Sequence, residues 1–399
     1  MLSVEEAREQ ILSRVRPLAT ERVDLLAGLG RVLAEAVRST RVIPPWPNSS
    51  MDGYAVRAAD TRAGAALTVI GRVVAGALPD RLVGPGETMR IFTGAPLPDG
   101  ADAVVPQEDV DATAERVTLR GATAGGAYVR PAGEDLQLGD LVLEAGTVLG
   151  PAEIGVLATL GRSQIEVTRR PRVAVLSTGS ELADLGAEPG PAQIPNANTY
   201  SLMAQVMEAG GVAINLGVAP DRLDVIGERI RRGREADVLV SSAGVSVGDL
   251  DLVRDALVTA GAELHLWKVN MRPGKPITFG SLEGRPVFGL PGNPVSAMVT
   301  FELFVRPALL AMQGRRRLDR PRIHAVAAAT ITNHGSRRGY LRVSLEQRDG
   351  RWHARLTGDQ GSGILRSMVQ ADGLAVLQGD TAARAGDEVE VIVMRDLSR

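Results

Sequence analysis

Two lysines are the most distinctive chemical groups of this chain, because every other residue among its 45 basic side chains is an arginine. Lys268 and Lys275 flank the segment Val269-Asn-Met-Arg-Pro-Gly274. An ammonium group is a compact point charge on a flexible stem, whereas a guanidinium group is a planar fork. A compact cation beside a Pro-Gly turn suits phosphate or another small oxyanion. The alternative is that the two lysines are chance survivors at a solvated strand end.

Two loops of small residues follow predicted buried strands. They are Ser177-Thr-Gly-Ser-Glu181 and Ser241-Ser-Ala-Gly-Val-Ser-Val-Gly-Asp249. Small residues let backbone N–H groups approach a phosphate, and the dipole of the following helix favours the anion. Neither loop matches the Walker A or Gly-x-Gly-x-x-Gly pattern, which argues against an ordinary NTPase or nicotinamide site. A plain strand-to-helix turn explains either loop alone. Both loops together, with Pro273-Gly-Lys-Pro276 and Pro291-Gly-Asn-Pro294, favour a phosphate-bearing ligand.

Carboxylates accompany these loops at Glu181, Asp221, Asp249 and Asp251. Acidic side chains beside phosphate-binding loops are typical of Mg²⁺, which takes one or two carboxylates and bridges phosphate oxygens. The alternative is helix N-capping, above all for Asp249 and Asp251, which precede a predicted helix.

Strands alternate with helices over residues 171–318, which predicts an α/β domain with a mainly parallel sheet. Ligands of such sheets bind where loops leave the carboxyl ends of the strands. Short strands separated by Gly and Pro predict a small β domain over 45–136 and a C-terminal β domain over 319–399.

The rest of the chain, 1–44 and 137–170, is expected to form a helical and β linker region whose first helix packs near the α/β domain. Apolar spacing predicts two helices within residues 4–37, the second around 25–33. A strand pair is predicted within 139–148, followed by a short helix at 151–159.

Composition excludes several classes of function. The chain has no cysteine, so thiolate and disulfide chemistry are excluded, and its four histidines are scattered. A net charge of −2 without a basic block predicts no nucleic-acid binding. Apolar runs fall short of the roughly 18 residues that span a bilayer, so no membrane association is expected. The polar N-terminal helix is unlike a signal peptide, and a cytoplasmic location is expected.

Eight short strings occur in one order over roughly residues 45–300: Met51–Ala55, Phe92–Ala95, Gly100–Val105, Gly133–Asp135, Ser177–Leu182, Gly244–Gly248, Arg272–Pro276 and Leu290–Ser296. Together with Gly361–Met368, they resemble the molybdopterin molybdotransferases, the MoeA-type enzymes that also include the E domain of gephyrin. The resemblance implies an elongated, multidomain subunit with a MogA-like α/β domain, acting as a homodimer. It also implies that molybdate is inserted into adenylylated molybdopterin, with Mg²⁺ present and AMP released.

Site roles follow from the same resemblance. The expected catalytic residues are Asp52, Thr93, Arg130, Asp135, Glu181, Lys268 and Lys275, the first four contributed by the partner chain. Substrate binding is expected at Thr178, Gly179, Ser180, Asn198, Gly244, Val245, Ser246, Gly248, Asp249, Arg272, Pro273, Gly274, Pro291, Gly292, Asn293, Ser296, Arg342 and Ser367. The expected metal ligands are Asp221 and Asp251. Arg272 stands where the family commonly has Lys, and Ala243 where it usually has Gly.

Three alternatives remain open at this point. One is a catalytically silent scaffold that binds the pterin. Another is a molybdopterin adenylyltransferase, although the extra modules argue against it. A third is a tungsten-dependent relative, because tungstate and molybdate are nearly equal in size and charge. Expected protein partners, besides a second copy, are a molybdopterin adenylyltransferase and molybdoenzyme maturation proteins.

Overall fold

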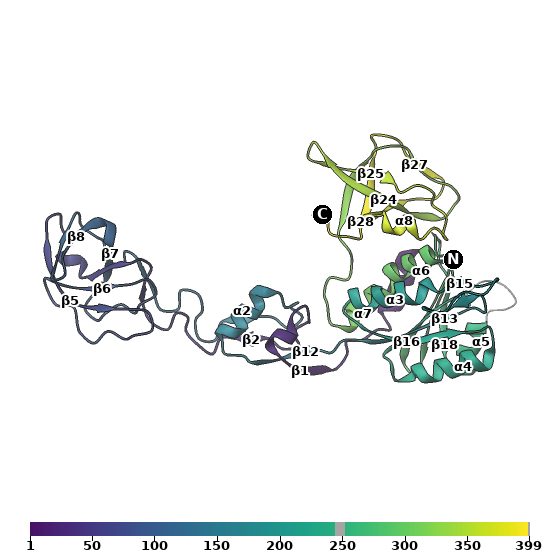
Figure 1. Ribbon diagram of the computed structural model, residues 1–399, viewed down its shortest axis with the longest axis horizontal. Coiled ribbons are helices and arrows are strands. Elements are labelled where there is room, and N and C mark those ends of the chain that lie inside the picture. Colours follow the sequence, from purple (N-terminus) through teal and green to yellow (C-terminus); the bar gives the residue numbers. More distant parts are fainter. Residues whose placement is uncertain (244–251, 398–399) are drawn as a thin grey trace. The chain divides into compact units, whose positions relative to one another are not determined.

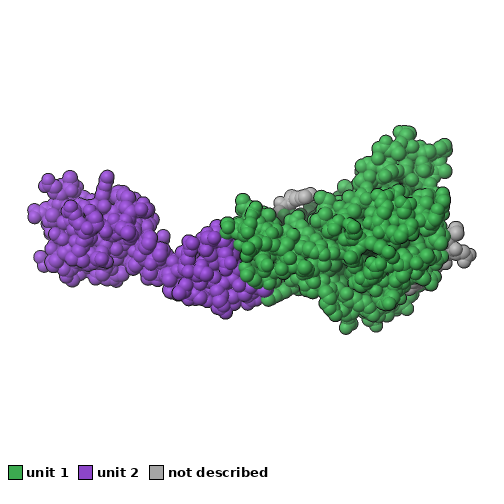
Figure 2. All heavy atoms as spheres, turned by 90° about the horizontal axis from the view of Figure 1, so that it is seen from below, with its two compact units in different colours: residues 1–35, 146–154, 163–399 green, residues 36–145, 155–162 purple. Residues whose placement is uncertain are grey.

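The structure is a computed structural model that describes residues 1–243 and 252–397. Its internal contacts divide the chain into two compact units (Figure 2). The large unit comprises residues 1–35, 146–154 and 163–399, and the small unit comprises 36–145 and 155–162. The boundaries of the four predicted domains stay predictions.

A six-stranded sheet forms the centre of the large unit, in the order β16-β13-β17-β21-β20-β18 (Figure 1). The first four strands are parallel, and β20 runs antiparallel to both of its neighbours. The mainly parallel α/β domain is therefore confirmed. The strands are β13 (Arg172–Thr178), β16 (Val212–Ala219), β17 (Val238–Ser242), β18 (Glu263–Lys268), β20 (Pro276–Leu282) and β21 (Arg285–Leu290). The central ones are apolar without alternation because helices cover both faces.

One face of this sheet packs against α4 (Leu223–Arg232) and α5 (Leu252–Thr259) (Figure 1). The other packs against α3 (Ala197–Glu208), α6 (Pro294–Thr300) and α7 (Arg306–Met312). A π-helical turn, η5 (Phe301–Val305), joins α6 to α7. The continuous helix is long and apolar enough to cross a membrane, yet 83% of it is buried in the fold, as in a core helix.

The first helix is confirmed as α1 (Val4–Leu12), which begins with a capping box between Ser3 and Glu6. It buries its apolar face in the core of the α/β domain. The second predicted helix is wrong, because β1 (Thr20–Asp24) pairs with β12 (Gln164–Thr168) and only the 3-10 turn η1 (Leu25–Gly28) follows. Pairing with a strand distant in sequence overrides the local helical spacing.

The predicted C-terminal β domain is confirmed and lies in the same unit. Its sheet has the order β19-β24-β25-β22-β28-β26, with β24 also paired to β26. The elements are β19 (Met271–Arg272), β22 (Arg322–Ala327), β23 (Ile331–Asn333), β24 (Arg338–Arg348), β25 (Arg351–Leu356), α8 (Arg366–Val369), β26 (Gly373–Leu377), β27 (Thr381–Ala383) and β28 (Glu388–Val393). Since β19 belongs to the lysine-bearing segment, this segment joins the two domains.

The small unit confirms the small N-terminal β domain. Its sheet has the order β7-β4-β6-β5-β9-β8, made of β4 (Gly53–Val56), β5 (Ala66–Val73), β6 (Glu87–Ile91), β7 (Ala103–Pro106), β8 (Val110–Ala112) and β9 (Arg116–Leu119). Two short pairs accompany it, β3 (Asn48–Ser49) with β10 (Val129–Arg130) and β2 (Val37–Arg38) with β11 (Leu141–Leu143). The strand pair predicted within 139–148 is wrong in its partner, because β11 pairs with β2. The helix at 151–159 is confirmed as α2 (Pro151–Thr159).

Candidate functional site

The loops after β13 and β16 are tied to each other. The Ser180 N–H donates to Asp221 Oδ2 over 3.0 Å, and the Asp221 N–H donates to Ser180 Oγ over 3.1 Å. Gly179 has φ +146°, and an added Cβ would lie 2.6 Å from Glu181 Oε2, so this position requires glycine. The structure therefore brings Gly179, Ser180, Glu181 and Asp221 together, as expected for strand ends in a parallel sheet.

Hydroxyl groups line the end of β13. Ser177 Oγ lies 2.6 Å from Thr199 Oγ1, which also accepts from Asn196 Nδ2 over 2.9 Å. The Asn196 side chain caps α3 by accepting from the Thr199 N–H. The neighbouring Thr178 hydroxyl is buried and has no hydrogen-bond partner among residues 1–243 and 252–397. A buried unpaired hydroxyl at a strand end is available to a ligand.

Asn198 connects three loops at the start of α3. Its Nδ2 atom donates to Ser242 Oγ over 2.7 Å and to the Gly292 carbonyl oxygen over 2.6 Å. An added Cβ at Gly292 would lie 3.2 Å from the Ala243 Cβ. Ala243 itself has φ +75°, a conformation that favours glycine. Hydrogen bonds within the protein therefore use the amide nitrogen of Asn198. The predicted role of Asn198 in substrate binding stays a prediction.

Six predicted residues lie outside the described part of the chain: Gly244, Val245, Ser246, Gly248, Asp249 and Asp251. Their roles stay predictions, including half of the predicted metal pair.

The lysine turn, residues 268–276, connects β18 to β20 by way of β19. Its backbone is held by the Val269 N–H, which donates to the Lys275 carbonyl over 3.1 Å. Gly274 has φ +100°, and an added Cβ would lie 2.4 Å from Thr300 Cγ2, so glycine is again required. Both lysines are half-buried, and their ammonium groups form no hydrogen bond or ion pair with any residue in the described ranges.

The remaining cation of this turn is partly engaged. Arg272 is exposed, and its Nη1 donates to the His334 carbonyl oxygen over 2.8 Å. Pro273 beside it is buried. The turn thus presents two ammonium groups without a partner among the described residues, and a guanidinium group of which one nitrogen, Nη1, already donates a hydrogen bond.

The start of α6 meets a loop of the C-terminal domain. Asn293 Nδ2 donates to Ser362 Oγ over 2.9 Å, and the Val295 N–H donates to the Ser362 carbonyl over 3.1 Å. Pro291 lies just before this contact. Ser296 is 4% exposed in the first turn of α6. The loop around Ser362 therefore covers the helix N-terminus that the sequence pointed to.

Arg342 and Ser367 hold that loop. The fully buried Arg342 donates from Nε to Ser367 Oγ over 3.0 Å and from Nη2 to the Gly361 carbonyl over 3.0 Å. Burial lowers the pKa of Arg342 to about 10; Asp359 opposes this shift and Arg272 adds to it. The side chain stays charged at neutral pH, and the structure shows both residues positioning the loop.

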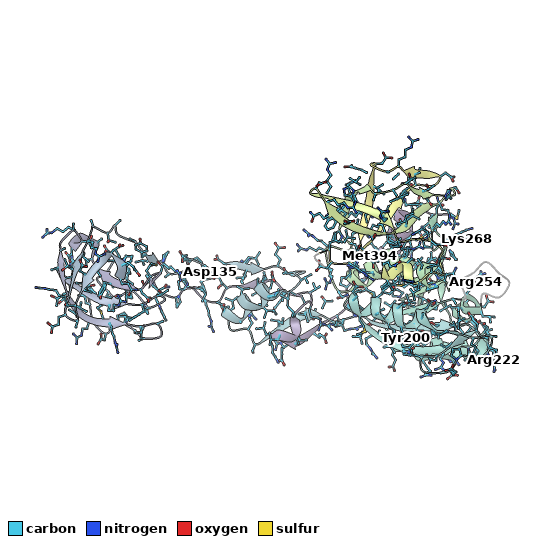
Figure 3. All side chains as sticks on the ribbon, turned by 45° about the horizontal axis from the view of Figure 1, so that its top comes forward. Asp135, Tyr200, Arg222, Arg254, Lys268 and Met394 are labelled. Atoms are coloured by element: carbon cyan, nitrogen blue, oxygen red, sulfur yellow. The ribbon has the colours of Figure 1, made fainter. Side chains whose placement is uncertain are left out.

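A second predicted cluster lies in the small unit. Asp52 Oδ1 accepts from both the N–H and the hydroxyl of Thr93, each over 2.8 Å. These two bonds, and more weakly the charge of Arg90, lower the pKa of Asp52. Arg130 pairs with Asn48 in the strand that leads to Asp52. Asp135 is exposed, and its N–H donates to Ile43 (Figure 3). Asp52 and Thr93 are in contact, whereas the backbone contacts of Arg130 and Asp135 are with Asn48 and Ile43 and not with that pair.

Among the described residues, no three His, Cys, Asp or Glu side chains converge in a way that could hold a metal ion. Asp221 has one oxygen bound to the Ser180 N–H, and the neighbouring Glu181 is exposed. Mg²⁺ usually keeps several waters and binds through one or two carboxylates plus phosphate oxygens. This donor set fits a hydrated Mg²⁺ held together with a phosphate ligand.

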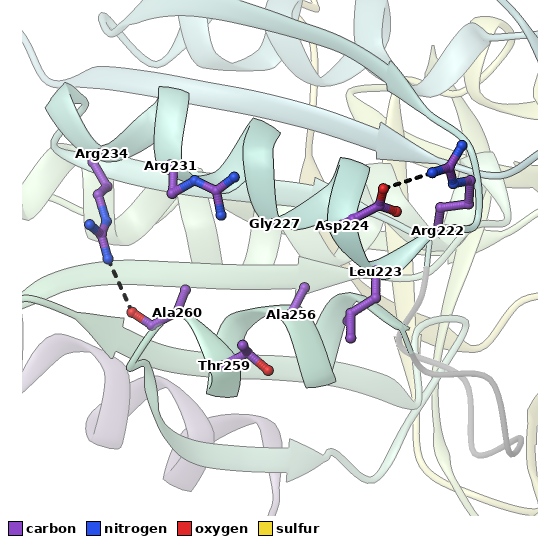
Figure 4. A pocket seen from close by; sticks show the side chains of 9 residues that line it. All are labelled: Arg222, Leu223, Asp224, Gly227, Arg231, Arg234, Ala256, Thr259 and Ala260. Atoms are coloured by element: carbon purple, nitrogen blue, oxygen red, sulfur yellow. Dashed lines mark hydrogen bonds and ion pairs between the residues drawn. The ribbon is translucent and has the colours of Figure 1, made fainter.

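A pocket of about 600 Å³ lies between α4 and α5 (Figure 4). At one end of the pocket, Arg222 Nη2 donates to Asp224 Oδ2 over 2.7 Å. At the other end, Arg234 Nη2 donates to the Ala260 carbonyl oxygen over 3.2 Å. None of the motif residues lines this pocket. The candidate site is therefore at the strand ends.

Sequence reasoning missed several residues that organise the site: Thr199, Ser242 and Ser362. Ser242 lies in the small-residue loop that begins at Ser241, and Ser362 lies in the Gly361–Met368 string, so both belong to motifs that the sequence analysis had singled out. Thr199 had no signal, since its role depends on contact with Ser177 on another element.

Comparison with known proteins agrees with this geometry. Family profiles match at residues 2–161 (MoeA N-terminal region, domain I and II), 174–311 (probable molybdopterin binding domain) and 324–394 (MoeA C-terminal region, domain IV). The molybdopterin molybdenumtransferase of Nostoc sp. is 40% identical over 385 residues, covering 94% of this chain and 88% of the relative. Molybdopterin molybdenumtransferase 2 of Mycobacterium tuberculosis is 36% identical, covering 98% and 99%.

Solved structures agree as well. The molybdopterin biosynthesis MoeA protein from Pyrococcus horikoshii superposes with a TM-score of 0.85 at 34% identity, covering 99% of this chain and 100% of that one. Identity above 30% over nearly the whole chain leads to one conclusion. The chain belongs to the molybdopterin molybdenumtransferase (MoeA) family.

Proposed function

We propose that the protein is a molybdopterin molybdotransferase, which inserts molybdate into adenylylated molybdopterin and releases AMP in a Mg²⁺-dependent reaction. The observation that carries the proposal is the pair of ammonium groups on the lysine turn, which have no partner among the described residues. Relatives named molybdopterin molybdenumtransferase support a role in molybdenum cofactor biosynthesis. Molybdate and the pterin nucleotide are both anionic and require cations and backbone donors.

The pterin nucleotide is proposed to bind along the strand ends of the α/β domain. Gly179 has no side chain to cover the backbone, and the buried Thr178 hydroxyl has no hydrogen-bond partner among the described residues. The Asn198 bonds keep three loops in fixed register around this edge. The loop of residues 244–251 is expected to add contacts to the phosphates.

Molybdate is proposed to bind at the lysine turn. Lys275 supplies a compact charge, Arg272 a fork and Ser296 a hydroxyl group. Lys268 adds a second ammonium group at the end of β18. Unpaired cations in a half-buried turn attract an oxyanion strongly because no internal ion pair must first be broken.

Breaking a phosphoanhydride depends mainly on positioning and on neutralising developing charge. Asp221 and Glu181 would hold Mg²⁺, which when bound neutralises phosphate charge. The Ser180–Asp221 link keeps that carboxylate fixed before any ligand arrives. Lys275 is proposed to stabilise the oxyanion that attacks the link.

The site is proposed to be completed in a homodimer, with Asp52, Thr93, Arg130 and Asp135 donated by the second subunit. Asp52 already has one carboxylate oxygen fixed by Thr93, which leaves the other available. A molybdopterin adenylyltransferase is the proposed supplier of substrate, and molybdoenzyme maturation proteins are the proposed acceptors. The proposed location is the cytoplasm.

The test is AMP release from adenylylated molybdopterin and Mg²⁺, measured with and without molybdate. We expect release that depends on molybdate and that Lys275→Ala abolishes. Arg285→Ala, on the same sheet, serves as a surface control.

Other outcomes identify the alternatives. Tight pterin binding without turnover would indicate a scaffold, and AMP transfer from ATP to molybdopterin would indicate an adenylyltransferase. Faster turnover with tungstate than with molybdate would indicate a tungsten enzyme. Absence of any pterin binding would refute the proposal.

A further inference from the structure

We propose that Arg90 is a positioning residue for the Asp52–Thr93 pair and that it acts by stacking between the aromatic side chains next to the two motif residues. This inference deepens the proposed function, on which its activity measurement rests. Arg90 lies on β6, two residues before Phe92 and three before Thr93. It belongs to none of the strings that carry the family resemblance.

The guanidinium group of Arg90 contacts both motif segments. Its Cζ atom is 4.9 Å from the ring centroid of Tyr54 and 5.2 Å from that of Phe92. Tyr54 follows Asp52 by two residues, and Phe92 directly precedes Thr93. Both distances lie within the range of a cation–π contact, which is stronger when the site is partly desolvated. One planar cation thus links the two segments that must stay in register.

Hydrogen bonds fix the orientation of this cation. Arg90 Nη2 donates to Gln107 Oε1, and Nη1 lies 3.5 Å from the Gly53 carbonyl oxygen, at the outer limit of a hydrogen bond. Gly53 has no room for a side chain, because an added Cβ would lie 2.1 Å from the Val105 carbonyl oxygen, and its strand pairs with both β6 and β7. Arg90 therefore holds the Phe92–Thr93 segment against a strand that is itself fixed by close backbone packing.

The functional consequence concerns the orientation of Asp52. Thr93 donates two bonds to Asp52 Oδ1 and leaves Oδ2 without a bond to any residue that the structure describes. Without the Arg90 side chain, only the backbone pairing of β4 with β6 still links the Phe92–Thr93 segment to Tyr54, and the carboxylate gains rotational freedom. Loss of orientation at a catalytic group lowers kcat more than it raises KM.

The experiment compares Arg90→Met, Arg90→Lys and Arg72→Met in the full-length chain. Met keeps the length of the side chain but removes its charge and donors, and Lys keeps the charge but not the planar fork. Arg72 is the exposed cross-strand neighbour of Arg90 and serves as the matched control. The first measurement is the Thr93 amide proton shift by NMR, which reports its bond to Asp52 whatever the reaction. The second is kcat and KM for molybdate-dependent AMP release.

In Arg90→Met we expect the Thr93 amide signal to move toward that of a solvent-exposed amide. We also expect kcat to fall about tenfold while KM changes less than about twofold. Arg90→Lys should show smaller changes of the same kind, and Arg72→Met none. If Arg90→Met fails to fold, Arg90→Lys decides the question.

Unchanged Thr93 signals and kcat in both Arg90 variants would overturn the proposal. A shifted Thr93 signal with unchanged kcat would overturn its link to the reaction. If the wild-type protein releases no AMP, the proposed function fails, and the Thr93 signal alone then decides whether Arg90 positions the pair.

Discussion

The carboxylate-bearing loops and the lysine turn are built on opposite principles. Asp221 and Asp52 each accept bonds from a neighbouring loop before any ligand is present. Lys268 and Lys275 have ammonium groups without partners among the described residues. In each unit the carboxylate is thus fixed by the fold, while the two ammonium groups keep their charge for an incoming group.

This difference shows how one fold separates stability from function. A hydrogen-bonded carboxylate adds to stability, so its removal should affect both folding and turnover. A half-buried ammonium group without a partner contributes little to the free energy of unfolding, because it forms no bond and stays partly hydrated. Its removal should therefore affect turnover alone. The comparison predicts different signatures for the two regions.

The largest expected effect is on the lysine turn. Lys275→Ala should lower molybdate-dependent turnover by about 100- to 1,000-fold, as for loss of a preorganised transition-state donor. The melting temperature should stay unchanged, because no bond to a described residue is lost. Steady-state kinetics and calorimetry check both parts. A large drop in melting temperature would contradict the idea that this cation is reserved for a ligand.

Gly274→Ala should damage the backbone of the same turn. Alanine there meets both a positive φ and a Thr300 contact at 2.4 Å. We expect a loss of about 3 kcal/mol in the free energy of unfolding. Gly284→Ala is the control, since it has φ +77° but open space and should cost only about 1 kcal/mol. Denaturant titration measures both. Equal losses would show that the Thr300 contact relaxes freely.

Ser180→Ala should produce the mixed signature of the carboxylate loops. It leaves the Asp221 N–H without its 3.1 Å partner. The free energy of unfolding should fall by about 1 kcal/mol. Turnover should also fall, because Asp221 keeps only one of its two bonds to residue 180, the one from the backbone N–H. Thermal melts and AMP release, measured on the same sample, distinguish this result from that of Lys275→Ala.

Ala243→Gly should stabilise the protein slightly. The native alanine has φ +75°, which glycine adopts without steric cost. The gain in the free energy of unfolding should stay below about 1 kcal/mol, because glycine also gains freedom in the unfolded chain. A destabilised variant would indicate that the freedom of glycine in the unfolded chain outweighs the relief of backbone strain.

The smallest expected effect is on the titration of Asp52. Its pKa is depressed below the ordinary value of 3.8, mainly by the Thr93 bonds. A depressed carboxyl pKa stabilises the fold above the unfolded value, and the contribution disappears as pH falls through the folded pKa. Thr93→Val removes only the hydroxyl bond and keeps the Thr93 N–H bond, so the Asp52 pKa should rise part of the way toward 3.8, as NMR titration can show. An unchanged pKa would assign the depression to the remaining Thr93 N–H bond and the charge of Arg90.

The sequence predicted the α/β domain best, because the spacing of its apolar residues and the positions of its turn residues indicate the same strands and helices. The helix predicted at 25–33 failed because its residues are used elsewhere: after η1, Val32 and Leu33 form bridges to Val148 and Val167, far along the chain. The predicted ligand contact at Asn198 stays a prediction, and its bonds to Ser242 and Gly292 depend on tertiary proximity that the sequence does not reveal. Family strings pointed to candidate residues, while only coordinates show which of their atoms the fold already uses.

The scarcity of lysine has a practical consequence. Both side-chain amines of the protein lie on one turn, half-buried and unbonded to the described residues. An amine-directed reagent would therefore modify this turn and the amino terminus while leaving the many arginines untouched. Mass spectrometry of such labelling, with and without candidate anions, would convert a compositional peculiarity into a direct footprint of site occupancy.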